Sequence, residues 1–173
     1  MEILLATANL HKIREFRDMF KSLTHIELIS LHHFHHYTVP EETGKTFKEN
    51  AILKAEHAAK HLDKWVLADD SGLVVPALNG EPGVWSRRYA GPEATDMENR
   101  AKLLQAMQHL KASHERIAYF ECCLAIANPT GLKKCVEGIC EGQIVKEPRG
   151  RHGFGYDSLF IKNDYEKTFG ELD

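Results

Sequence analysis

The sequence has 173 residues, 43% hydrophobic and 27% charged, which suits one folded domain and excludes an intrinsically disordered chain. A net charge of −3 and a pI near 6.4 argue against a broad surface for nucleic acid or membrane, but they allow a compact basic pocket. No apolar run approaches the roughly 18 residues of a membrane span. From charge and hydropathy together, we expect neither a nucleic acid nor a membrane as a partner.

The first half of the chain alternates between strand and helix patterns. Short apolar runs predict strands at 2–6, 26–31 and 65–68, and apolar residues at helical spacing follow the first strand from Ile13 to Leu23. Thr46-Phe47-Lys48-Glu49 fits a capping box, in which the Thr hydroxyl and the Glu carboxylate each accept a hydrogen bond from a free backbone amide at the helix start. The apolar positions from Phe47 to Leu62 then predict a helix of about five turns.

The second half begins with a long Gly- and Pro-rich loop, NGEPGVWSRRYAGPE, a length typical of functional loops. A second capping box at 95–98 opens a further helix, and strands are predicted at 117–127 and 132–145, paired across a turn at 128–131. A glycine-rich loop and a short strand close the chain. With no repeat or linker, residues 1–173 are predicted to form one α/β domain with a mixed sheet.

The cysteines and the histidine-rich run predict no metal centre. Cys122, Cys123, Cys135 and Cys140 include no CxxC pair, and the MEILLATAN start is unlike a signal peptide, so we expect free thiols in the cytoplasm. LHHFHHY lacks regular ligand spacing, which favours a solvated loop.

The stretch LADDSGL places two adjacent carboxylates, Asp69 and Asp70, at the predicted end of a buried strand. Burying neighbouring carboxylates without partners is costly. One interpretation is a plain turn, because Asp, Ser and Gly are all turn formers. The other is a metal or acid–base site. The stretch alone leaves both open.

Two neighbouring segments carry candidate phosphate ligands. In LLATANLHK, a strand enters a helix through Thr7 and Asn9, and free amides there, with Lys12, suit an anion. The alternative is ordinary capping by Asn9 with Lys12 at the surface. Lys54 lies beside the apolar stripe of the second helix and points either outward or into a cleft.

The segments flanking that second helix carry four carboxylates, at Glu41, Glu42, Asp69 and Asp70. Mg²⁺ prefers such hard oxygen ligands and completes its shell with water and substrate phosphates. The lysines nearby therefore indicate a polyphosphate substrate.

The GFGYD loop at 153–157 holds two aromatic rings between glycines. The rings suit stacking on a flat base, or they pack in the core.

In order, ATANLHKIREF, EETGKTFKENAILKA, LADDSGL, NGEPGVWSRRYAG and GFGYDSLF resemble the inosine triphosphate pyrophosphatase family, also called XTP/dITP diphosphatases. The resemblance covers nearly the whole chain. It implies an α/β fold with a mixed elongated β-sheet flanked by helices, and two lobes around a central substrate cleft. It also implies a homodimer.

The resemblance further implies roles for single residues. Asp70 would be the general base and bind Mg²⁺ with Glu41, for which Glu42 is the close alternative, while Lys54 would lie against the phosphates. The substrate would contact Thr7, Asn9, Lys12, Ser71, Phe154, Gly155, Tyr156 and Asp157, with Phe154 as the stacking partner.

The implied reaction is Mg²⁺-dependent attack of water on the α-phosphorus of ITP, dITP or XTP, which releases a monophosphate and pyrophosphate and cleanses the nucleotide pool. Two departures from the family pattern stand out: Trp85 stands where a tyrosine is common, and the sequence stops at GELD without the family's C-terminal tail, a Ser-His-Arg run and a last helix.

Three other functions are compatible with parts of the pattern. A Maf-like pyrophosphatase would act on modified pyrimidine nucleotides or dTTP. A non-catalytic nucleotide-binding protein would account for the missing tail. A phosphatase of the haloacid-dehalogenase type would use an Asp nucleophile, but those enzymes place their second Asp two residues after the first.

Overall fold

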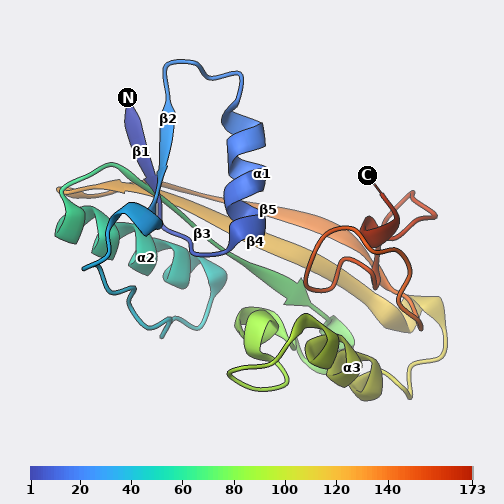
Figure 1. Cartoon of the computed structure of the whole chain (residues 1–173). Helices are drawn as coiled ribbons and strands as arrows, with labels where there is room; N and C mark the ends of the chain where they lie inside the picture. The colour runs from blue at the N-terminus through green and yellow to red at the C-terminus, as the bar shows by residue number, and fades with distance from the viewer. Residues whose placement is uncertain (173) are drawn as a thin grey trace. The chain divides into compact units, whose positions relative to one another are not determined.

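The computed structural model describes residues 1–172 (Figure 1). The strands are β1 (Glu2–Leu5), β2 (Glu27–Ser30), β3 (Val66–Val74), β4 (Ile117–Asn128), β5 (Gly131–Ile144) and β6 (Phe160–Lys162). The α-helices are α1 (Leu10–Phe20), α2 (Phe47–Leu62) and α3 (Asp96–Ala106). Short 3₁₀ helices are η1 (Leu31–His33), η2 (Pro76–Leu78), η3 (Gly83–Arg88), η4 (Ser113–Arg116) and η5 (Phe169–Glu171).

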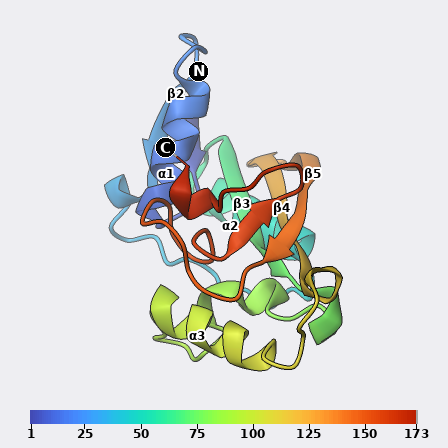
Figure 2. The same cartoon turned by 90° about the vertical axis from the view of Figure 1, so that its right-hand side faces the viewer.

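The strands form one mixed sheet in the order β2-β1-β3-β4-β5-β6. Strand β1 pairs in parallel with β2 and with β3, whereas β6 pairs antiparallel with β5. Strands β4 and β5 run side by side in Figures 1 and 2, as the predicted turn between them requires. The predicted α/β class with a mixed sheet is confirmed.

The chain divides into two compact units. Unit 1 comprises Met1–Asp70 and Cys122–Glu137, and unit 2 comprises Ser71–Glu121 and the chain from Gly138 onward. The long strands β3, β4 and β5 contribute residues to both units. Two units agree with the two lobes that the resemblance implies, while the central cleft stays a prediction.

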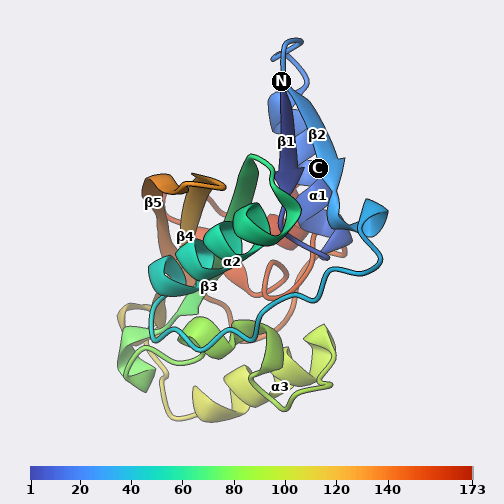
Figure 3. The same cartoon turned by 90° about the vertical axis from the view of Figure 1, so that its left-hand side faces the viewer.

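Unit 1 is built on the parallel strands. Its core packs Ile3 and Leu5 of β1 against Phe16 of α1 and Leu67 of β3. Of the predicted apolar stripe, helix α2 buries Phe47 and the alanines, while Leu62 is only partly buried. Helix α2 lies alongside β3, whereas α1 lies beside β1 and β2 (Figure 3). The two helices therefore bring different side chains to β3.

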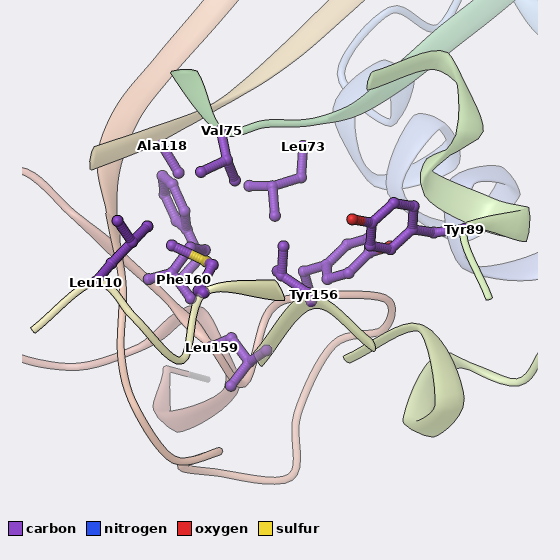
Figure 4. Packing of buried hydrophobic residues seen from close by; sticks show 11 residues of the cluster. Leu73, Val75, Tyr89, Leu110, Ala118, Tyr156, Leu159 and Phe160 are labelled. Carbon is purple, nitrogen blue, oxygen red and sulfur yellow. The ribbon is translucent and has the colours of Figure 1, made fainter. Parts of the chain in front are cut away.

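Unit 2 has its own core, seen from close by in Figure 4. Leu73 of β3 and Val75, the residue after this strand, pack there with aromatic and aliphatic side chains of later segments, which include Tyr89, Leu110, Ala118, Tyr156, Leu159 and Phe160. The predicted capping box of α3 is confirmed: Thr95 Oγ1 accepts from Glu98 N, and Glu98 Oε2 accepts from Thr95 N.

Two local predictions need correction. The strand at 65–68 was expected to end before Asp69, but β3 continues to Val74, so both aspartates lie within a strand. At α2, Thr46 Oγ1 accepts from Glu49 N as expected, yet the Glu49 carboxylate accepts from Lys45 N and not from the capping residue. Within the described chain, no helix has the length and apolar character needed to cross a bilayer.

Candidate active site

Asp69 and Asp70 can be neighbours in a buried strand because each has its own lysine. Successive side chains of a strand point to opposite faces, so the two carboxylates face away from each other. Lys12 of α1 pairs with Asp69, and Lys54 of α2 pairs with Asp70. Asp69 and Asp70 are only 3% and 8% exposed, which makes these partners necessary.

Lys54 joins the two sides of a small charged cluster. Its Nζ donates to Glu42 Oε1 at 2.9 Å and to Asp70 Oδ1 at 3.2 Å. Burial would lower the pKa of Lys54, but the carboxylates of Asp70 and Glu42 outweigh it and raise the pKa. Lys54 is therefore a fixed positive charge in unit 1.

The Asp70 carboxylate has a raised pKa and, in the described part of the chain, one oxygen without a hydrogen bond. Burial raises its pKa, and the Lys54 charge opposes this rise without cancelling it. Its Oδ1 accepts from Lys54, while its buried Oδ2 has no hydrogen-bond partner among residues 1–172. A raised pKa and an unpaired oxygen are properties expected of a general base.

The structure brings Glu42, and not Glu41, to this cluster. Glu42 is half-buried against Lys54, whereas the Glu41 side chain is exposed. Residues 1–172 contain no cluster of three or more His, Cys, Asp or Glu side chains arranged to hold a metal ion. Glu42 and Asp70 are thus the two oxygen donors gathered around Lys54, and the identity of the metal ligands stays a prediction.

At the start of α1, Asn9 is a true cap. Its Oδ1 accepts from His11 N at 2.9 Å and from Lys12 N at 3.4 Å, and Asn9 N donates to Thr7 Oγ1 at 3.2 Å. Two amides that the sequence left free for an anion are therefore occupied by Asn9. Lys12, however, is not the surface lysine of the capping alternative, because it is bound to buried Asp69.

The GFGYD loop of unit 2 is held by its own polar groups. Asp157 Oδ2 accepts from Phe154 N at 2.8 Å, and Gly155 bonds Arg100 through its carbonyl and Asp96 through its amide. Gly153 has a φ of +75°, and a side chain there would collide with the Asp157 carboxylate. The carboxylate of Asp157 is thus engaged in shaping the loop.

The two rings of this loop have different surroundings. Tyr156 is 4% exposed, belongs to the unit 2 core, and donates from its hydroxyl to the Ser86 carbonyl at 2.8 Å, so its ring is packed rather than available for stacking on a base. This is the core alternative that the sequence left open. Phe154 is half-buried and remains the candidate for stacking, and Ser71 is half-buried beside Asp70 in sequence.

The histidine-rich run lies apart from the candidate residues. It forms η1 and the following loop, and together with the end of α2 it lines a pocket of about 620 Å³ that includes Tyr37, His57 and His61. None of the predicted site residues lines this pocket. The predicted solvated loop is confirmed at His35 and His36, which are exposed, whereas Leu31–His33 form a short 3₁₀ helix.

Two residues of the cluster were missed or ranked second by the sequence. Glu42 was the second choice because counting within a motif does not determine which of two adjacent carboxylates turns inward. Asn50 was not considered, although it is fully buried beside Asp70. Its signal was available: it falls on the apolar side of α2 by the helical period, where a polar residue needs a reason.

Known proteins match the chain over its whole length. Residues 3–173 match the family model described as Ham1 family. A dITP/XTP pyrophosphatase of Protochlamydia amoebophila is 68% identical over 173 residues, covering 100% of this chain and 87% of that protein. One from Chlamydia caviae is 49% identical over 172 residues, covering 99% and 84% respectively.

Solved structures agree. A HAM1 protein from Coxiella burnetii has a TM-score of 0.88 and 44% identity, and the Staphylococcus aureus Ham1 protein has a TM-score of 0.86 and 41% identity. Each comparison covers 100% of this chain and 87% of the other. This chain therefore belongs to the Ham1 family.

Proposed function

We propose that this protein hydrolyses non-standard purine nucleoside triphosphates, namely dITP, ITP and XTP, to the monophosphate and pyrophosphate. The names of the curated relatives support this activity. The structural observation that carries it is the cluster of Lys54, Glu42 and Asp70, in which a buried lysine faces a carboxylate with a free oxygen. Such a cluster combines a phosphate-binding cation with a proton acceptor.

In this proposal Asp70 is the general base. Its unpaired Oδ2 takes the proton as a water oxygen bonds to the α-phosphorus, and the bond between that phosphorus and the oxygen bridging to the β-phosphorus breaks. The electron pair leaves with pyrophosphate. A carboxyl pKa raised by burial makes Asp70 a stronger base than an exposed aspartate.

Lys54 and Lys12 supply the positive charge. Both are tied to carboxylates of β3, so their positions are set before substrate arrives. Lys54 would stabilise charge developing on the phosphates, while Lys12, with Thr7 and Asn9 at the start of α1, would contact the outer phosphates. The amides of His11 and Lys12 are not proposed as ligands, because Asn9 already occupies them.

The donor set of the cluster fits Mg²⁺. Mg²⁺ usually takes one or two protein carboxylates and fills its shell with water and substrate phosphates. Glu42 and Asp70 are two such carboxylates, and both form ion pairs with Lys54. Asp70 Oδ2 is in addition a buried oxygen without a hydrogen-bond partner among residues 1–172. When bound, Mg²⁺ would neutralise phosphate charge. We propose Glu42 and Asp70 as its protein ligands, in preference to Glu41.

Selection against ATP would follow from hydrogen bonds to the 6-oxo group of the purine. Donors that face a 6-oxo group are left unpaired by the 6-amino group of adenine, and unpaired buried donors cause strong discrimination. Phe154 is the proposed stacking residue, and Tyr156 is withdrawn from that role by its place in the core.

The test is product analysis with ITP, XTP, dITP, ATP and dTTP, each with and without Mg²⁺. We expect metal-dependent release of monophosphate and pyrophosphate from the first three substrates only. Preference for dTTP would support the Maf-like alternative, and orthophosphate as the product would indicate a phosphatase. No turnover of any substrate would reject the proposed activity.

Two further properties are proposed, the first from the resemblance and the second from the cysteines. We expect a homodimer, which light scattering of the purified protein would test directly. We also expect a cytoplasmic protein, in keeping with four cysteines that are all free thiols.

A further inference from the structure

Asn50 has one satisfied end and one unsatisfied end. It lies in the first turn of α2 and is 0% exposed. Its Oδ1 accepts from the Gly44 amide at 2.8 Å, but its buried Nδ2 has no hydrogen-bond partner among residues 1–172. Leaving a buried donor unpaired is costly, so this arrangement needs an explanation.

The reason lies on the neighbouring strand. The Asn50 side chain is close enough to Asp70 to favour the ionised form of its carboxylate and so lower its pKa, against the larger effect of burial. Asp70 Oδ2 is itself buried and unpaired. One group is a donor without an acceptor, and the other is an acceptor without a donor.

A second buried asparagine provides the contrast. Asn99 of α3 is 2% exposed, its Oδ1 accepts from Ala90 N at 2.8 Å, and its Nδ2 donates to the Arg87 carbonyl at 2.9 Å. Both ends of Asn99 are satisfied by main chain, as expected of an asparagine with a purely structural role. Asn50 resembles it at the oxygen end only.

The loop before α2 is shaped to hold Asn50. A Cβ added to Gly44 would lie 2.5 Å from Asn50 Oδ1 and 2.8 Å from Glu49 Cβ. Glycine is therefore needed here for close approach to the asparagine. The Gly44 amide binds the Oδ1 end of Asn50, so Nδ2 is the end left for the neighbouring carboxylate of Asp70.

We propose that Asn50 is a positioning residue for the general base: its Nδ2 donates to one lone pair of Asp70 Oδ2 and fixes the rotation of the carboxylate, while Lys54 holds Oδ1. The second lone pair of Oδ2 stays available to accept the proton of the attacking water. The inference rests on the proposed function, since it assigns Asn50 a part in the same reaction. Asn50 does not touch substrate; it acts through Asp70. The chain from the Gly44 amide through Asn50 to Asp70 thus ties the loop at 41–46 to the catalytic strand.

The first experiment exchanges the two side chains. Asn50→Asp keeps the acceptor for Gly44 but places a second carboxylate against Asp70, so we expect a lower midpoint in urea unfolding without metal or substrate. Adding Asp70→Asn restores one donor and one acceptor, and we expect the midpoint to recover to that of Asp70→Asn alone. Asn99→Asp is the matched control, and Asp70→Asn should not rescue it.

The second experiment measures catalysis with ITP and Mg²⁺. Gly44→Ala displaces the Asn50 amide without changing it, so we expect kcat to fall by about 10²-fold, as for a misplaced catalytic group, while KM stays near the wild-type value. Gly138→Ala is the control, because a Cβ there meets nothing within 4 Å. Its kcat should equal that of wild type.

Additive effects of Asn50→Asp and Asp70→Asn on the unfolding midpoint would overturn the contact, as would an unfolded double variant. A Gly44→Ala enzyme with wild-type kcat would overturn the positioning role. Absence of activity in the wild type would instead reject the proposed function, and the unfolding experiment would still decide whether the two side chains are paired.

Discussion

Replacing Lys54 by methionine should destabilise the protein strongly, because it leaves two carboxylates facing each other without their common partner. Methionine matches the length of the lysine stem and keeps its packing on α2, so the change isolates the charge. Lys54 is 8% exposed as a whole residue, so its ion pairs with Glu42 and Asp70 lie largely out of water.

The magnitude follows from the two distances. At an effective dielectric constant near 20, unit charges separated by 2.9 Å and 3.2 Å attract by about 6 and about 5 kcal/mol respectively. Desolvation of the three ions offsets much of this gain, and removal of one member of a buried pair typically costs about 3–5 kcal/mol. We expect a loss of that size for Lys54→Met.

The assay is urea unfolding followed by circular dichroism, with the free energy of unfolding compared at equal m-values. Lys48→Met is the matched control, since Lys48 lies on the same helix and pairs with Glu137 at 2.9 Å, but at the surface. Its unfolding midpoint should equal that of wild type. A Lys54→Met protein as stable as wild type would refute the view that the lysine compensates the buried carboxylates.

Three further predictions concern single side chains. Asp70→Asn should lower kcat by about 10²–10⁴-fold and keep the far-ultraviolet circular dichroism of wild type; retained Mg²⁺-dependent hydrolysis would exclude Asp70 as the base. Phe154→Ala should raise KM for ITP through lost stacking, and an unchanged KM would assign that ring to packing alone. Burial and a hydrogen bond to Glu81 raise the pKa of Tyr89 from 10.0 to about 12. The folded protein therefore holds this proton more tightly than the unfolded chain does, and the stability that Tyr89 contributes is lost as the pH rises from 10.0 to about 12. The difference in absorbance at 295 nm between wild type and Tyr89→Phe should therefore titrate near 12, and a midpoint near 10 would contradict the burial argument.

Local signals in the sequence were sufficient for most elements. The period of the apolar residues located α2, since Ala51, Ala55 and Ala58 are all fully buried in the structure. Capping residues Thr46 and Thr95 marked two helix starts correctly. The hydrogen bond from a backbone amide to the hydroxyl three residues earlier is a purely local contact, so the sequence pattern is enough to predict it. The order of the five motifs also indicated the family that the comparisons show.

Contacts distant in sequence were beyond such signals. Nothing local distinguishes Glu41 from Glu42; only the approach of Lys54, 12 residues away from Glu42, selects one of them. From the sequence, the Tyr156 ring suited stacking on a nucleobase as well as packing in the core. In the structure its hydroxyl donates to the Ser86 carbonyl, 70 residues away, and the ring is in the core. In both cases the residue type permits two environments, and the fold decides between them.

The pair Asp69-Asp70 separates the two kinds of information most clearly. The sequence by itself determined that two carboxylates adjoin a buried strand and that lysines occur on both neighbouring helices. Only the tertiary structure decided that β3 runs through the pair, so that alternation sends one carboxylate to Lys12 and the other to Lys54. The physical reason is that burying a charge depends on a partner from another part of the chain, and packing, unlike periodicity, determines which partner arrives.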